Sequence, residues 1–312
     1  MAPLPTVYQT ELTGRRDEVT VKQIWQQSNA GPLASGYGQL LTFTLSGSRY
    51  LLAVDAGANR GHLFQVSLEQ EIIDPIGSPL DLGQPWDAIE PFVLGNVPHL
   101  LMYAKRPGQF SFAPINSDLT LGPRYDYYRG HNPGATQGFD VTQPVVVNSS
   151  LYFLCYSFDS GTVNIYSLAV APTGIGRAAP LVANPVWLHT WAEKWTRFAF
   201  FYLGGEAYFL KTNVGKLNVN IDHVLDQPSL GTIEVGTNLQ LDGALDLSIV
   251  RSFYLPPADP YFVAYKADGD TTVYRFHADC QGWTKVAAFG AVPNATNLVP
   301  IQFDDSCALL FY

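Results

Sequence analysis

Residues 142–168, TQPVVVNSSLYFLCYSFDSGTVNIYSL, decide the fold of this chain. An apolar run ends at Val147, a short turn of Asn and Ser follows, and a second apolar run extends to Tyr156. A polar loop containing Gly161 precedes a third run, in which apolar and polar residues alternate. Two apolar runs across a short turn form a β-hairpin, and alternation with a period of two is typical of a half-buried strand. The segment therefore predicts three consecutive antiparallel strands.

The same unit recurs along the chain. Further copies start at Leu40, Ile89, Phe198 and Ser252, each with two apolar runs around a turn of Gly, Ser, Asn or Pro. The second run often ends near a tyrosine, and a polar loop with Gly or Asp follows it. The copies are spaced by roughly 50 residues, which is close to the period of the four-stranded blades of β-propellers. The repeat therefore predicts a ring of blades.

A sixth copy is divided between the two ends of the chain. Residues 297–312, NLVPIQFDDSCALLFY, supply a first and a second strand, and residues 5–14 and 17–27, PTVYQTELTG and DEVTVKQIWQQ, supply a third and a fourth. Pairing them in one blade would remove the exposed edges that an open sheet presents. We predict an all-β protein: a six-bladed β-propeller formed by residues 1–312 as a single domain, with its last blade completed by the N-terminal strands.

Composition and charge exclude several classes of partner. The net charge is −9 and the sequence contains no cluster of Lys and Arg that could bind phosphates, so we expect no nucleic acid partner. No apolar stretch is long enough to predict a membrane span. The start of the chain has no basic segment followed by an apolar core, which favours an intracellular protein, although a mature secreted form would look the same. No cofactor motif or metal-ligand spacing stands out, and we expect neither a cofactor nor a metal.

The repeats differ at the positions where the chain enters each first strand. These positions are Tyr37, Trp86, Phe139, Trp195, Asp246 and Asn297. The loops between the second and third strands, which gather on the same face of a propeller, add Arg106, Phe158 and Lys266. A lectin with one sugar site per blade must repeat its polar residues in every blade. The unequal residues instead favour one asymmetric pocket near the axis, where small-molecule sites commonly form between structural units.

Three further patterns have more ordinary explanations. Ser157, Asp159 and Gly161 match part of a sialidase turn once, without its closing Trp. Asp87, Asp140, Asp246 and Asn297 could offer oxygen ligands to calcium, but Asp also favours turns. Two long aromatic-rich connections, residues 124–137 and 184–195, carry His131 and His189. Long loops are often functional, but these histidines have equally simple roles at the surface.

One blade carries a resemblance to a known family. Its pattern runs from Trp86-Asp87 through Pro91-Phe92, Leu94, Pro98 and Leu100-Leu101 to Tyr103. It resembles six-bladed propellers of fungi, among them the hetero-Diels–Alderases of tropolonic sesquiterpenoid pathways. The resemblance extends over the whole chain at the level of blades and brings no catalytic residue with it.

The resemblance and the aromatic rim together predict a cofactor-independent cyclase of natural-product biosynthesis. A hydrophobic, unsaturated small molecule would bind in one axial pocket. Binding would use Tyr37, Trp86, Phe139, Phe158, Trp195, Asp246 and Lys266, and Arg106 or Arg197 would polarise a carbonyl. The alternative is a carbohydrate-binding lectin propeller.

Overall fold

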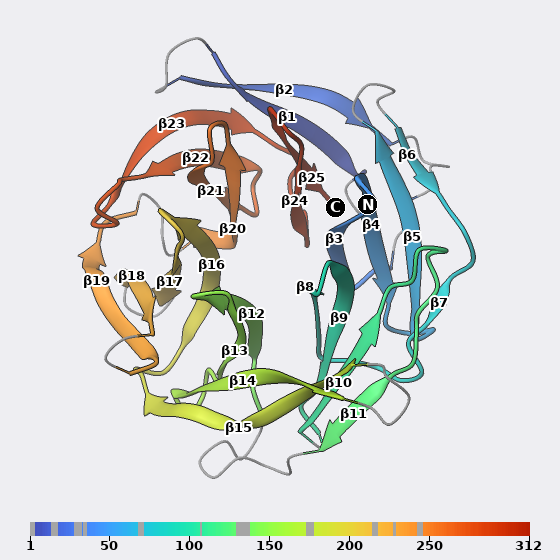
Figure 1. Cartoon of the computed structure of the whole chain (residues 1–312). Coiled ribbons are helices and arrows are strands. Elements are labelled where there is room, and N and C mark those ends of the chain that lie inside the picture. Colours follow the sequence, from blue (N-terminus) through green and yellow to red (C-terminus); the bar gives the residue numbers. More distant parts are fainter. Residues whose placement is uncertain are drawn as a thin grey trace.

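The computed structural model shows six β-sheets arranged as blades around a central axis (Figure 1). It describes residues 4–13, 18–27, 33, 36–67, 72–106, 108–128, 138–172, 178–213, 218–226, 229–241 and 246–312. These ranges contain strands and turns and no α-helix, so none of their elements is a helix that could cross a membrane. The predicted all-β, six-bladed propeller is therefore confirmed.

Each blade is an antiparallel sheet whose strands follow one another outward from the axis. Blade 1 consists of β3 (Gln39–Leu45), β4 (Ser48–Asp55), β5 (Arg60–Ser67), β6 (Ile72–Pro75) and the short β7 (Leu80–Asp81). Blade 2 consists of β8 (Ala88–Leu94), β9 (Val97–Ala104), β10 (Gln109–Pro114) and β11 (Tyr125–Tyr128). Blade 3 consists of β12 (Val141–Val147), β13 (Ser150–Tyr156), β14 (Thr162–Pro172) and β15 (Ala178–Thr190). Blade 4 consists of β16 (Trp195–Leu203), β17 (Glu206–Asn213), β18 (Asn218–Leu225) and β19 (Gly231–Leu239). Blade 5 consists of β20 (Leu247–Leu255), β21 (Asp259–Lys266), β22 (Asp270–Phe276) and β23 (Trp283–Gly290).

Blade 6 joins the two ends of the chain. Its strands are β24 (Leu298–Gln302), β25 (Cys307–Phe311), β1 (Thr6–Leu12) and β2 (Val19–Gln26), in the spatial order β2-β1-β25-β24. Thr6 pairs with Phe311 and Thr10 with Cys307, and the Thr10 hydroxyl donates to the Cys307 carbonyl at 2.8 Å. Figure 1 shows β1 and β25 side by side in this blade. The predicted division of the sixth repeat is therefore correct strand by strand.

The apolar core is divided into six clusters, one at each interface between neighbouring blades. Between blades 5 and 6, for example, Phe253 and Tyr261 pack against Leu309 and Phe311. Each blade thus buries one face against the blade before it and the other against the blade after it. This explains why the second strands are apolar on both faces, as buried sheets require.

The tyrosine that recurs at the end of the second strand connects neighbouring blades. In four blades its hydroxyl accepts a hydrogen bond from a backbone N–H at the start of the next blade. The pairs are Tyr103 with Phe139 at 3.0 Å, Tyr156 with Trp195 at 3.3 Å, Tyr265 with Ala295 at 2.8 Å, and Tyr312 with Tyr37 at 3.1 Å. We call these contacts the tyrosine latches. The equivalent position holds Val54 in blade 1 and Thr212 in blade 4.

Candidate active site

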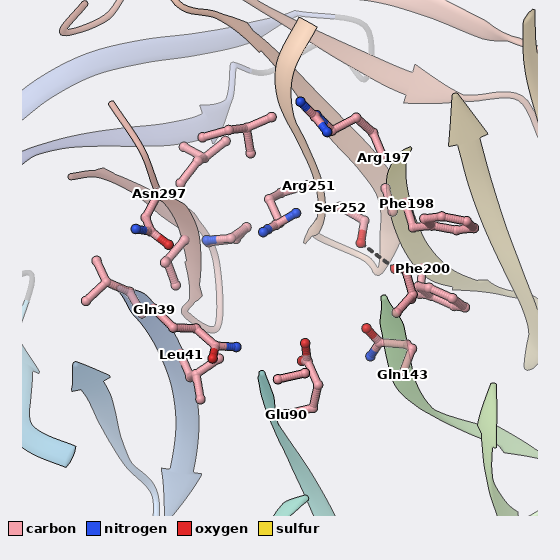
Figure 2. Close-up of a pocket in the computed structure, with 18 of the residues that line it drawn as sticks. Gln39, Leu41, Glu90, Gln143, Arg197, Phe198, Phe200, Arg251, Ser252 and Asn297 are labelled. Carbon is pink, nitrogen blue, oxygen red and sulfur yellow. Dashed lines mark hydrogen bonds between the residues drawn. The ribbon is translucent and has the colours of Figure 1, made fainter. Parts of the chain in front are cut away.

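A cavity of about 490 Å³ lies on the axis of the ring, walled by the first strands of all six blades. Each blade contributes a polar side chain to it within its first strand or immediately before that strand. These side chains are Gln39, Glu90, Gln143, Arg197, Arg251 and Asn297, in blade order (Figure 2). The wall therefore has no sixfold repetition. These six places hold one carboxylic acid, two guanidinium groups and three amides.

Glu90 is a carboxylic acid with an altered proton affinity. It follows Ile89 in β8, and its carboxyl and the Arg251 guanidinium point into the cavity from opposite sides (Figure 2). Burial raises its pKa from 4.5 to about 7, and the positive charge of Arg251 opposes that rise. No hydrogen bond from a described residue engages this carboxyl. Near neutral pH it therefore exchanges a proton readily, as a general base or acid must.

Two arginines place positive charge on the opposite wall. Arg251 donates to the Val250 carbonyl at 3.0 Å, and Arg197 donates to the Thr196 carbonyl at 3.1 Å. Burial lowers the pKa of both groups; for Arg251 the charge of Glu90 opposes this shift and the charge of Arg197 adds to it. A guanidinium group keeps its proton in proteins, so both side chains remain charged. Arg251 lies inside the ring of blades, and its side chain is exposed to the axial channel. Two guanidinium groups in one cavity favour an anionic ligand.

Amide groups complete the wall. The Gln39 amide donates to the Ile89 carbonyl at 2.6 Å, and the Gln143 amide donates to the Pro144 carbonyl at 3.3 Å. These bonds orient two side chains that line the cavity with Asn297 (Figure 2). Because amides both donate and accept, such a set suits the hydroxyl groups of a polar ligand.

Of the residues predicted from the sequence, Arg197, Phe158 and Asn297 line the cavity. Trp86, Phe139 and Trp195 do not. They pack in the interfaces between blades, where Trp86 donates to the Leu82 carbonyl at 2.9 Å. The reason is steric: a large ring at the start of a first strand covers the apolar cluster between two blades.

The other predicted binding residues also lie away from the channel wall. Tyr37 packs in the interface between blades 6 and 1, beside Tyr312. Asp246 is exposed immediately before β20, and Lys266 forms an ion pair with Asp270 at 3.2 Å. Arg106 lines a separate cavity of about 250 Å³ between blades 2 and 3.

Asp140 lies at the boundary of that smaller cavity and the channel, and lines both. Its carboxylate pairs with the Lys105 ammonium at 2.5 Å and accepts the Phe158 N–H at 2.7 Å. Asp87 accepts the Lys105 N–H at 2.7 Å. These two carboxylates therefore fix loops, as Asp does in turns. Across the described ranges, no three His, Cys, Asp or Glu side chains gather closely enough to hold a metal ion.

The structure describes the two long connections to different extents. His131 and residues 129–137 lie outside the described residues. His189 belongs to β15, so that the second connection is largely a strand, and its ring stacks on Trp187 with centroids 5.2 Å apart.

Glu90, Arg251, Gln39 and Gln143 were not among the residues predicted from the sequence. Glu90 and Arg251 nevertheless carry a signal, because each is the single charged residue of its first strand. The residues predicted in their place lie where the chain enters these strands, two to five residues earlier in the chain.

Comparison with known proteins supports the fold. No family model matches the sequence, and no curated protein matches it. Among solved structures, a candidate 6-phosphogluconolactonase of Bacteroides fragilis is similar at 12% identity, with a TM-score of 0.56 over 95% of this chain and 84% of that one. The periplasmic gluconolactonase PpgL of Pseudomonas aeruginosa is similar at 11% identity, with a TM-score of 0.51 over 93% and 98%. A GH43 β-1,3-galactosidase solved with galactodeoxynojirimycin is similar at 11% identity, with a TM-score of 0.51 over 84% and 96%.

These findings correct the function expected from the sequence. The similar structures are described as sugar lactonases and a glycosidase, and the channel wall contains charged groups and amides beside its aromatic and aliphatic residues. The hypothesis of a hetero-Diels–Alder cyclase with a hydrophobic substrate is therefore wrong. The alternative of a lectin with an equivalent site in every blade gains no support either, because the six residues of the wall are unequal.

Proposed function

We propose that this protein is a hydrolase that opens the lactone of a small, polyhydroxylated acid in the axial channel. One observation carries the proposal: burial raises the pKa of Glu90 to about 7, and its carboxyl faces the Arg251 guanidinium in a cavity that Arg197 and three side-chain amides also line. This set combines a base for water, positive charge for a developing oxyanion, and hydrogen-bonding groups for a sugar. The lactonases among the structures of similar fold support the same class of substrate.

The reaction follows from the positions of these groups. Glu90 takes a proton from a water molecule, whose oxygen attacks the lactone carbonyl carbon. The carbonyl oxygen becomes an oxyanion, which Arg251 stabilises. When the tetrahedral intermediate collapses, the bond from the carbonyl carbon to the ring oxygen breaks, and Glu90 returns its proton to the leaving alkoxide. The products are a hydroxyl group and a carboxylic acid, which then ionises.

The remaining wall would set the specificity. Gln39, Gln143 and Asn297 would bind the ring hydroxyls, while Arg197 would bind an acidic substituent such as a phosphate. Glycoside hydrolysis is less suited to this site because it needs two carboxyl groups on either side of the bond that breaks. In the described part of the wall, Asp140 is the only other carboxylate, and it is already bound by Lys105 and the Phe158 N–H.

Hydrolysis of glucono-1,5-lactone and of its 6-phosphate, followed by acid release and corrected for the spontaneous reaction, tests the proposal. We expect the wild-type protein to accelerate at least one of them, at a rate that rises with pH through a point near 7. Glu90→Gln should lower kcat by about 100-fold or more, the effect typical of a general base. Arg251→Met should lower kcat by a similar factor.

Asp74→Asn is the matched control, because Asp74 is an exposed carboxylate on the outer strand β6. It should leave the rate unchanged. Hydrolysis no faster than the spontaneous reaction, or a Glu90→Gln variant as active as the wild type, would contradict the proposal.

A further inference from the structure

A second cavity, of about 260 Å³, lies between blades 3 and 4. Its walls come from the end of β15, the loop that follows, and the outer strands β18 and β19. The residues that matter are His189, Trp191, Trp195, Asp222, Thr232 and Glu234. It shares none of its lining residues with the axial channel. The two cavities are therefore separate sites.

Lys211 contacts four of the residues that line this cavity. Its ammonium lies 2.8 Å from the Asp222 carboxylate and 3.1 Å from the Glu234 carboxylate. It also lies 4.5 Å from the centre of the Trp191 ring and 4.8 Å from that of Trp195. The side chains of Lys211 and Asp222 are each only 1% exposed. Burying such a pair costs free energy, which only good geometry offsets.

The buried pair of Lys211 and Asp222 departs from the apolar pattern that the other blades repeat at this place. Lys211 precedes the position of the tyrosine latch, and the same place in the other five blades holds an apolar residue or cysteine. Those residues are Ala53, Met102, Cys155, Ala264 and Phe311. All five are buried in the clusters between blades. The framework of the propeller therefore does not need a charge here, and blade 4 alone provides one.

Two buried polar atoms beside this pair lack a partner in the described part of the chain. They are the second carboxylate oxygen of Asp222, Oδ1, and the indole nitrogen of Trp195, Nε1. Asp222 is 1% exposed and Trp195 is 4% exposed, and both line the cavity. A buried polar atom without a partner costs about 1–3 kcal/mol. One is an acceptor and the other a donor, and a hydroxyl group can satisfy both.

We propose that this cavity binds a single small, neutral polyol ring, with a hydroxyl group that donates to Asp222 Oδ1 and accepts from Trp195 Nε1. The ring would pack on Trp191, which is partly exposed at the cavity wall. The cavity is smaller than the sites of drug-sized ligands and suits one ring in place of a chain. Lys211 balances only one of the two carboxylates, so the remaining negative charge disfavours an anion. This site therefore selects a different ligand from the cationic channel.

The loop that carries Trp191 is held in place by Gly161. The Trp191 N–H donates to the Gly161 carbonyl at 2.8 Å, and a Cβ at Gly161 would lie 2.2 Å from the Trp191 carbonyl oxygen. Gly161 also has a φ of 67°, which favours glycine. The ring of Trp191 thus has a fixed position, as a stacking platform requires.

Calorimetric titration with glucose, galactose and mannose tests this site. We expect saturable binding of at least one of these sugars by the wild-type protein. Trp191→Ala and Asp222→Asn should each weaken that binding about tenfold or more. Trp191 is the safer position because its ring is partly exposed, and circular dichroism verifies that each variant is folded. Glu90→Gln, in the channel, should leave the binding unchanged.

The proposal does not depend on the lactonase activity, and either can fail alone. The absence of saturable binding by all three sugars would overturn it. Binding that persists unchanged in Trp191→Ala would also overturn it, because the sugar would then occupy another site.

Discussion

Blades 4 and 5 each have four antiparallel strands in the same spatial order, but they differ at the end of the second strand. Blade 5 has Ala264 and Tyr265 there, and blade 4 has Lys211 and Thr212. Ala264 is buried in an apolar cluster, and Tyr265 latches the start of blade 6. Lys211 is equally buried but is paired with Asp222, and no latch is formed by Thr212. The comparison shows that the scaffold is built from repeated apolar contacts and latches, while chemistry is found where one blade departs from them.

The largest expected effect is at Lys211. Lys211→Met gives blade 4 the residue that blade 2 has at the equivalent position, Met102, and leaves the Asp222 carboxylate buried without its partner. We expect a loss of about 3–5 kcal/mol in the free energy of unfolding. Urea denaturation at pH 8, where the carboxylate must ionise or be neutralised at a cost, measures it.

The double variant sharpens this result. Lys211→Met with Asp222→Leu removes both charges, and we expect it to recover most of the lost stability, since apolar replacements of buried pairs are often neutral. Lys266→Met in blade 5 is the control and should change stability by less than about 1 kcal/mol, as expected of a surface pair. A single Lys211→Met variant as stable as the wild type would show that the pair is not integral to the interface.

The latches should have a smaller effect. Tyr265 accepts the Ala295 N–H at 2.8 Å and donates to the Val292 carbonyl at 2.9 Å. Tyr265→Phe removes both bonds and should lower the free energy of unfolding by about 1–3 kcal/mol. The control is Tyr50→Phe, which changes a half-buried ring outside the latches. Equal losses at Tyr265 and Tyr50 would mean that the latch adds nothing beyond the packing of its ring.

The smallest predicted effect is a gain in stability at Glu90. Burial raises its folded pKa from 4.5 to about 7, so the folded state holds this proton more tightly than the unfolded state. Ionising Glu90 therefore destabilises the protein as the pH rises from 4.5 to 7, and the cost is complete above 7. The shift corresponds to roughly 3 kcal/mol, of which water in the channel screens a part.

Glu90→Gln removes this cost. We expect the variant to be about 1–2 kcal/mol more stable than the wild type at pH 8 and equally stable at pH 4. Thermal or urea unfolding at the two pH values measures the difference. A variant that is less stable than the wild type at pH 8 would indicate that the carboxylate makes favourable contacts in its charged form.

The fold could be predicted from the sequence because its signals are local and repeated. The hairpin of residues 142–168 contains its own turn and alternation, and four other segments repeat it. The divided blade was predictable as well, because residues 297–312 lack two strands that residues 5–27 supply. Both predictions depend on hydrophobic patterns. These patterns recur in every blade because every blade packs against two neighbours.

The site was harder to predict because its residues occur only once each. Trp86 and Phe139 are large and differ from the residues at the same place in other blades, so they resembled binding residues of the axial pocket, but their rings pack on the clusters between blades. Glu90 and Arg251 occupy positions in first strands, where single charges are easily taken for the exposed face of a strand. Lys211 becomes conspicuous only after its five equivalents are aligned, and Asp222 only when the structure places it 2.8 Å from Lys211.

The proton affinity of Glu90 is the decisive property of the channel, because the proposed general base and its cost in stability both depend on it. Carbon NMR of protein labelled at the glutamate side-chain carboxyl carbons, titrated from pH 3 to pH 9, measures it without any substrate. We predict one resonance that titrates near pH 7 in the wild type and is absent from Glu90→Gln. If every glutamate titrates below pH 5, Glu90 is an ordinary carboxylate, and the proposed reaction in the channel is wrong.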